Sequence, residues 1–418
     1  MRIQSRPAER LAVLVFLASC AAWYGRETVS KIVPLLGGVS DFRKYYEAAR
    51  QIVEGHSPFA AAGYIYPPLL AEILTPLAHL SYLEARWIWY LASQCALLWA
   101  AWLIWQACGR DWAVACSIAL VWALGGAARE ALWLGQVSPL LALLLAAAYT
   151  SAESRSGAAL GSGLALKFIP GMLAFGLLLS RSRAGLAAFV ASASVLLALP
   201  WFYVSCCLVG PRTPVGTDMW TGTPAPLSWS VPSTVLRILD RPAHAGELPR
   251  NWDQVELTDL RLPADQRTAS VAAAATTVIA GALVLFLAVG GRLSAKQLPW
   301  AMAGLLSLGL AVSPVSWSHY QAMQYPGVAM LLAHALRSRR WKLLLATLAC
   351  AATLYPVPVA VLGAYYRRHN SWSTVPLPAL YFWTSAATLA SLALFGLFVR
   401  ESRRAAASSK GSGPCFLL

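Results

Sequence analysis

Long apolar runs recur from one end of the 418-residue chain to the other. Many of them are long enough to cross the roughly 30 Å hydrocarbon core of a membrane as a helix. Charged residues make up 12% of the chain, whereas a soluble domain carries about a quarter. We therefore predict an all-α polytopic membrane protein.

The apolar runs predict about twelve membrane-spanning helices. Their expected ranges are residues 9–28, 68–83, 85–107, 111–128, 132–150, 157–180, 184–207, 267–291, 298–314, 320–336, 341–363 and 377–399. Twelve crossings put both termini on one side, and every strongly basic short segment falls on that side. By the positive-inside rule that side is cytoplasmic. The same rule accounts for the net charge of +15, so we expect no nucleic-acid partner.

Three segments then face outward, which in a bacterial inner membrane means the periplasm. The first is the loop 29–67. The second is the long loop 208–266, which contains a possible short helix over Ser233–Leu239 and is expected to be a lid or an acceptor-binding element. The third is the loop 364–376, and residues 400–418 form a cytoplasmic tail. We treat residues 1–418 as one transmembrane domain.

Two stretches weaken this topology. The run 68–83 is short and contains Glu72 and Pro76. The run 111–150 can be divided into spans in more than one way, so the side on which residues 128–136 lie stays open. No internal repeat is visible, whereas inverted-repeat transporters usually show corresponding broken segments in both halves.

The first outer loop contains a short amphipathic segment that begins at Ser40. At a helical period its apolar residues share one face, and its charged residues share the other. The apolar face comprises Phe42, Tyr45, Tyr46, Ala49, Ile52 and Val53. This pattern predicts a helix that lies in the membrane interface, followed by an extended Tyr64–Pro68 segment that fixes it over a cavity.

Asp41 stands at the start of this helix and has two interpretations. It is a candidate general base that takes a proton from an incoming hydroxyl group. Ser40 or Asp41 also suits the N-cap position of a helix. The local sequence leaves these alternatives open.

Lys167 falls near the middle of the predicted span 157–180. A lysine at that depth is costly, so we expect it to face a polar cavity and to pair with an anion. Pro170, three residues later, would open the helix locally and make room for a ligand.

The segment Ser313–Gln321 brings Ser316, Ser318, His319, Tyr320 and Gln321 to an outer span boundary. His319 is a candidate donor to a phosphate oxygen. Gly135–Gln136 is a weaker candidate, because it also suits an ordinary helix boundary. The chain has no G-x-G-x-x-G or Walker loop and no metal-ligand spacing, so we expect no nucleotide or metal cofactor.

Several stretches together resemble a known family. SDFRKYYEAARQIVEGHSPF with YIYPPLLAEILTPLAHL resembles the first outer loop and second span of the polyprenol-phosphate-mannose-dependent mannosyltransferases, glycosyltransferase family 87, of the GT-C type. LGQVSPLLALLL, LALKFIPGM and SPVSWSHYQ resemble later stretches of that family in the same order. The resemblance covers most of residues 11–336 and does not extend to the loop 208–266.

The resemblance implies a GT-C fold in which Asp41 is the catalytic base. The donor would be a polyprenyl-phosphate-linked sugar, mannose in the better-known members and arabinofuranose in others. The acceptor would be a glycan or glycolipid. Lys167 and His319 would bind the phosphate, and the remaining substrate-binding residues would be Tyr45, Tyr66, Gln136 and Tyr320.

Other functions fit the same residues. A flippase or transporter for a lipid-linked glycan would use Lys167 but would need no base. A glycan polymerase or ligase would use a donor that carries a whole oligosaccharide. Transfer in detergent and competition between donors would separate these classes.

Overall fold

The computed structural model describes residues 7–38, 40–213, 293–313, 316, 318–354 and 377–407, with isolated residues at 231, 281, 357, 358, 361 and 364. Several predicted features lie outside the described residues: the span 267–291, the Ser233–Leu239 helix, most of the loop 208–266, the loop 364–376 and the tail beyond residue 407.

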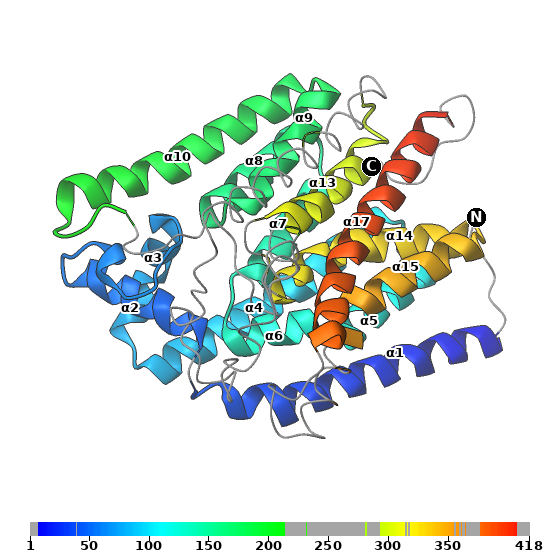
Figure 1. Ribbon diagram of the computed structural model, residues 1–418, viewed down its shortest axis with the longest axis horizontal. Helices are drawn as coiled ribbons and strands as arrows, with labels where there is room; N and C mark the ends of the chain where they lie inside the picture. The colour runs from blue at the N-terminus through cyan, green and yellow to red at the C-terminus, as the bar shows by residue number, and fades with distance from the viewer. Residues whose placement is uncertain are drawn as a thin grey trace.

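The described residues form helices joined by short connections (Figure 1). Their strand-like pairing is limited to one isolated β-bridge between His56 and Val209. The all-α class is therefore confirmed. The helices of eight or more residues are α1 (Pro7–Glu27), α2 (Asp41–Val53), α4 (Tyr82–Ala107), α5 (Trp112–Leu124), α6 (Gly126–Leu134), α7 (Ser138–Thr150), α8 (Glu153–Leu166), α10 (Arg183–Cys207), α13 (Leu298–Val312), α14 (Tyr325–Arg337), α15 (Trp341–Leu354) and α17 (Leu377–Ala407).

Two described helices, α4 and α10, are long and apolar enough to cross a membrane on their own. A third crossing arises if α5 and α6 count as one span, which is bent by 53°. Other described helices, including α7 and α13, are apolar but shorter. The predicted number of about twelve spans is thus not confirmed. The prediction of a helical membrane protein is confirmed.

Two predicted spans are broken. The run 68–83 is a seven-residue helix, α3 (Pro68–Leu74), followed by a 3₁₀ turn over Thr75–His79. The prediction of one continuous helix over residues 68–83 was therefore wrong, because Pro76 lacks the backbone N–H that an α-helix needs. The span 157–180 is likewise interrupted: α8 ends at Leu166, and α9 (Ala174–Ser180) resumes only after a 3₁₀ turn over Ile169–Leu173. Residues 400–407 continue α17 rather than starting a tail.

The core of the bundle is built around α13, in which every residue is buried. α17 packs along it, and the pairs α8–α10 and α4–α7 continue the bundle on its other side. Outward-facing side chains of α10 such as Leu199 and Phe202 are 64% and 66% exposed. Large exposed apolar side chains on a long helix suit contact with lipid rather than water.

The α8–α10 contact is close because both helices have glycine there. A Cβ atom added to Gly157 would lie 1.9 Å from the carbonyl oxygen of Gly185. Small residues let helix backbones approach in this way within membranes. The close contact fixes α8, and therefore the position at which it stops before Lys167.

α2 and α3 lie together at one end of the bundle, next to the end of α10 (Figure 1). The start of α1 and the end of α17 lie toward the opposite end. The predicted amphipathic helix is therefore confirmed, and its buried face includes Phe42, Tyr45 and Tyr46. Val53 was wrongly assigned to that face: it is 45% exposed, and Ala48 is buried instead.

Candidate active site

Asp41 is the first residue of α2, and its side chain binds other side chains rather than the helix backbone. Oδ1 accepts a hydrogen bond from Lys44 Nζ at 2.8 Å, and Oδ2 accepts one from Gln136 Nε2. The hydroxyl of Ser40, at the N-cap position, makes no capping bond and contacts Tyr82 Oη at 2.9 Å. The carboxylate thus has fixed partners, while 25% of its side chain remains exposed.

Gln136 connects Asp41 to two tyrosines. Its Oε1 accepts hydrogen bonds from Tyr45 Oη at 3.1 Å and from Tyr66 Oη at 3.3 Å. Burial raises the pKa of both phenols well above the usual value, so both stay protonated and donate. Because Oε1 is occupied by two donors, the amide NH₂ of Gln136 faces Asp41.

These contacts decide the charge of Asp41. Burial alone would raise the pKa of its carboxyl, but the charge and hydrogen bond of Lys44 and the hydrogen bond of Gln136 outweigh it. The pKa of Asp41 is therefore below its ordinary value. The carboxylate is ionised at neutral pH, which is the form that can accept a proton.

Lys167 lies over the rings of Tyr320 and Tyr66. It is the residue at which α8 stops, and its backbone is extended. Its Nζ lies 3.3 Å from the ring centroid of Tyr320 and 5.3 Å from that of Tyr66. It is 8% exposed and has no hydrogen-bond partner within the described part of the chain.

His319 completes the cluster from a 3₁₀ segment, Ser318–Gln324, that precedes α14. Its ring lies edge-on to that of Tyr320, with the centroids 4.8 Å apart. Its Nε2 is buried and, among the described residues, has no hydrogen-bond partner. The structure thus brings all seven predicted site residues into one connected cluster.

Other polar residues of the same segment have different partners. The hydroxyl of Ser318 donates to both carboxylate oxygens of Glu130, at 2.8 and 2.7 Å, which ties this segment to α6. Gln321 accepts from Gln324 Nε2 at 2.5 Å and faces α17. The sequence placed Ser318 and Gln321 with His319, but both serve the packing of the segment.

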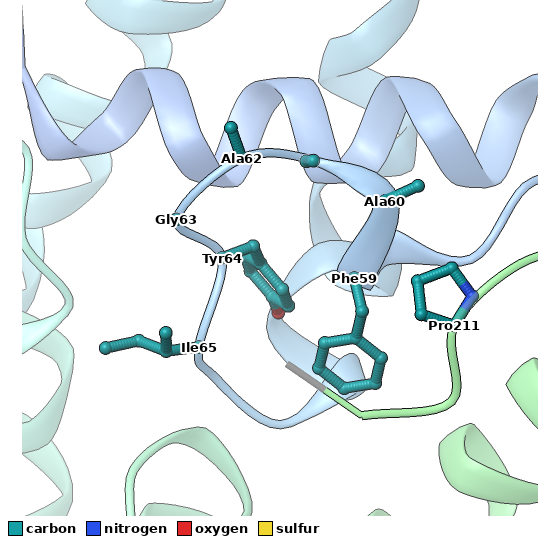
Figure 2. Close-up of a pocket in the computed structure, with 8 residues that line it drawn as sticks. Phe59, Ala60, Ala62, Gly63, Tyr64, Ile65 and Pro211 are labelled. Atoms are coloured by element: carbon teal, nitrogen blue, oxygen red, sulfur yellow. The ribbon is translucent and has the colours of Figure 1, made fainter. Parts of the chain in front are cut away.

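A hollow of about 310 Å³ adjoins this cluster in the first outer loop (Figure 2). Phe59 lies there beside Pro211, and the aliphatic part of Lys44 lies next to Gly63. The hollow is lined by Phe59, Ala60, Ala61, Ala62, Gly63, Tyr64, Ile65 and Pro211. Backbone bonds between residues 55–57 and Val209, and one from Ser57 Oγ to Pro211 O at 2.5 Å, join the two outer loops here.

Sequence reasoning missed two contributors to the site. Lys44 appeared only as part of the polar face of α2, although it pairs with Asp41. Arg86 was passed over at the start of the predicted span 85–107, yet its side chain is completely buried next to Gly135. The pattern that singled out Lys167, a cation inside an apolar run, would also have found Arg86.

Within the described residues no group of three or more histidine, cysteine or acidic side chains is arranged to hold a metal ion. The site instead combines a hydrogen-bonded carboxylate with a buried ammonium and a buried imidazole. Such a set is suited to proton transfer at one end and to binding a negatively charged group at the other.

Fold and site together define a helical membrane protein with a buried cluster of one carboxylate, one lysine, one histidine and several tyrosines. The family model of glycosyltransferase family 87 matches residues 64–314. The chain belongs to this family, as its sequence stretches indicated, and it is a glycosyltransferase. The matched range includes Tyr66, Gln136 and Lys167. The other four site residues, Asp41, Tyr45, His319 and Tyr320, lie outside it.

Among solved structures, the chain is similar to ArnT from Cupriavidus metallidurans. The crystal structure bound to undecaprenyl phosphate is 16% identical, with 95% of this chain and 79% of ArnT covered and a TM-score of 0.40. The apo structure is 16% identical, with 96% and 79% covered and a TM-score of 0.42.

Proposed function

We propose that the protein transfers a single sugar from a polyprenyl-phosphate donor to a glycan or glycolipid acceptor, by a GT-C-type mechanism. Asp41 is the base, and the transfer is a single displacement that inverts the anomeric carbon. The donor sugar is mannose, and the site faces the periplasmic side of the inner membrane.

In this reaction the acceptor hydroxyl attacks the anomeric carbon of the donor sugar. Its proton passes to Asp41 Oδ, the new glycosidic bond forms from the acceptor oxygen, and the bond from the anomeric carbon to the phosphate oxygen breaks. Polyprenyl phosphate leaves with that electron pair. Lys167 and His319 stabilise the negative charge that grows on the departing phosphate.

One observation carries the proposal. Lys167 Nζ and His319 Nε2 are both buried without a hydrogen-bond partner among the described residues, and both lie against the Tyr320 ring, close to the Asp41–Gln136 pair. Buried polar groups favour hydrogen-bond partners, and an ammonium and an imidazole that lie against the same ring suit a shared anionic ligand. A lipid phosphate supplies oxygens to both.

The surroundings of Asp41 support acceptor binding on the other side. The hollow lined by residues 59–65 and Pro211 adjoins Lys44, which holds Asp41 Oδ1. Its volume of about 310 Å³ is at the lower end of the range for ligand pockets. An acceptor hydroxyl that arrives from this hollow meets the exposed part of the Asp41 carboxylate.

The test is Asp41→Asn in purified, detergent-solubilised protein, with polyprenyl-phosphate-[³H]mannose and a set of glycolipid acceptors. General-base catalysis contributes roughly 10²- to 10⁴-fold, so we expect transfer to fall by at least about 100-fold. Binding of undecaprenyl phosphate should stay within a few-fold of wild type. Near-native transfer by the Asn variant would refute the assignment of the base.

Glu54→Gln is the matched control, because it makes the same change at the exposed end of the same helix. It should retain full activity. A flippase would show no transfer in detergent from any donor. If only polyprenyl-phosphate-arabinofuranose or an oligosaccharide-linked donor supports transfer, the sugar assignment is wrong while the base assignment stands.

A further inference from the structure

Arg86 is a completely buried arginine in α4 that takes no part in the proposed reaction. Its Nη2 donates to the carbonyl oxygens of Leu132 at 3.0 Å and Trp133 at 2.5 Å. These carbonyls belong to the last turn of α6, where carbonyls lack the usual i+4 partner; Leu132 O also accepts the backbone N–H of Gly135 at 3.2 Å. The cation also lies at the negative end of the α6 dipole.

Trp89, almost one turn further along α4, holds the same end of α6. Its Nε1 donates to the carbonyl oxygen of Gly135 at 2.8 Å. Gly135 has a left-handed backbone, with φ of 71°. A Cβ atom there would lie 2.6 Å from Phe42 Cβ and 2.7 Å from Arg86 Nη1. The turn that ends α6 is therefore pressed between α4 and the start of α2.

This turn leads directly to the base. Gln136, the next residue after Gly135, donates to Asp41 Oδ2. On the other side Phe42, the next residue after Asp41, lies under the Arg86 guanidinium, whose central carbon is 5.5 Å from the ring centroid. Arg86 thus contacts both segments that the Gln136–Asp41 hydrogen bond joins.

We propose that Arg86, with Trp89, is a positioning pair that locks the end of α6 so that the Gln136 amide stays aimed at Asp41. The proposal rests on the proposed function only in taking Asp41 as the base. Among the described residues neither side chain hydrogen-bonds to Lys167 or His319, and Trp89 reaches the cluster through Tyr45, with ring centroids 6.5 Å apart. Both are therefore positioning residues.

The choice of arginine supports this role over simple packing. No carboxylate in the described part of the chain forms an ion pair with Arg86, whose charge faces carbonyl groups, the Phe42 ring and the nearby Tyr82 side chain. Burying a cation is costly, and an apolar side chain would fill the same space at lower cost. Both carbonyl bonds come from Nη2, while Nε and Nη1 are buried and, among the described residues, have no hydrogen-bond partner. The planar guanidinium holds Nη2 at the two carbonyls while its face lies over the Phe42 ring, an orientation that the rotating ammonium of a lysine does not fix.

The test measures the protonation of Asp41 without donor or acceptor. A neutral diazo reagent esterifies a carboxyl only in its protonated form, with loss of N₂. The labelling of Asp41 against pH, read by peptide mass spectrometry in detergent, gives the midpoint of its titration. Since a hydrogen bond to a carboxylate lowers its pKa, loss of the Gln136 bond should raise the midpoint by about one pH unit.

We expect Arg86→Met and Gln136→Leu to raise the midpoint by similar amounts, and Arg86→Met/Gln136→Leu to equal Gln136→Leu alone. Trp89→Phe, which keeps a ring but removes the bond to Gly135, should give a smaller rise. Arg86→Lys should restore part of the wild-type midpoint. A full additional shift from Arg86→Met on the Gln136→Leu background would overturn the proposal, because the arginine would then act directly by its charge.

The matched control is Arg129→Met. Arg129 also binds a helix-terminal carbonyl, that of Ala123 at 2.6 Å, but makes no contact with Gln136; its variant should leave the midpoint unchanged. If Arg86→Met does not fold, Trp89→Phe provides the test. A folded Trp89→Phe protein whose Asp41 titration midpoint equals that of wild type would overturn the proposal. The titration of Asp41 is measured without any sugar transfer. The test of the positioning pair therefore stays valid even if the proposed reaction is wrong.

Discussion

Replacing Lys167 with methionine should abolish tight binding of lipid phosphate without weakening the fold. In the ligand-free protein the ammonium is 8% exposed and its nearest favourable contact is the Tyr320 ring, 3.3 Å from Nζ. A desolvated cation–π contact stabilises by about 2 kcal/mol, while burying an ammonium costs several kcal/mol. The two effects nearly cancel, or favour methionine. The melting temperature of Lys167→Met should therefore equal or exceed that of wild type.

The substitution Lys167→Met should weaken the binding of the lipid phosphate. A hydrogen bond between a charged donor and a phosphate oxygen contributes about 1.5–3 kcal/mol. Its loss corresponds to an increase in Kd of about 10- to 150-fold. The assay is a titration of detergent-solubilised protein with undecaprenyl phosphate, followed by intrinsic fluorescence or by ligand-induced thermal shift.

Lys31→Met is the control, because the exposed Lys31 already has a carboxylate partner, Glu27, at 2.7 Å; the Kd of this variant should equal that of wild type. The reasoning is refuted if Lys167→Met melts several degrees lower while its Kd stays at the wild-type value. That result would make Lys167 a structural cation with a partner outside the site.

The remaining predictions concern the base and the turn that holds its partner. Activity should fall as the pH decreases through the pKa of Asp41, which the Lys44 ammonium lowers. Lys44→Met should raise that pKa, so the acid limb of kcat/KM should move to higher pH. The shift should be less than about one pH unit, because the Asp41–Lys44 pair is partly exposed. Gly135→Ala would put a side chain at a φ of 71° and 2.6 Å from Phe42 Cβ, so we expect at least about 1–2 kcal/mol of destabilisation, seen as a lower melting temperature, and loss of transfer. An alanine variant with native melting and activity would contradict this.

Elements set by local pattern were predicted well. The helical period of residues 41–53 predicted α2 and most of its buried face, because side-chain direction repeats every 3.6 residues whatever the fold. Val53 was misplaced because it stands at the last turn, where α2 extends beyond its packing partners and the side chain is 45% exposed. The apolar runs likewise predicted α4 and α10, whose ends agree with the expected spans to within a few residues.

Breaks inside apolar runs were predicted less well. Pro170 indicated an opening in the helix that carries Lys167, and the structure has α8 stop at Leu166. The sequence marked the runs 68–83 and 111–150 as uncertain, but it did not locate the break in the first run or the 53° bend between α5 and α6. Hydropathy reports the environment of a segment, and a broken helix in an apolar environment has the same composition as a straight one.

The sequence by itself determined that this is a helical membrane protein, that a short amphipathic helix begins with an acidic residue, Asp41, and that a lysine, Lys167, lies inside an apolar run, where a cation is costly. Only the tertiary structure decided what Asp41 contacts. Its partner Gln136 is 95 residues away, and the Arg86 and Trp89 bonds that end α6 join helices about 46 residues apart. No local period encodes such distances: they arise when the helices pack, and packing turns separate polar residues into one site.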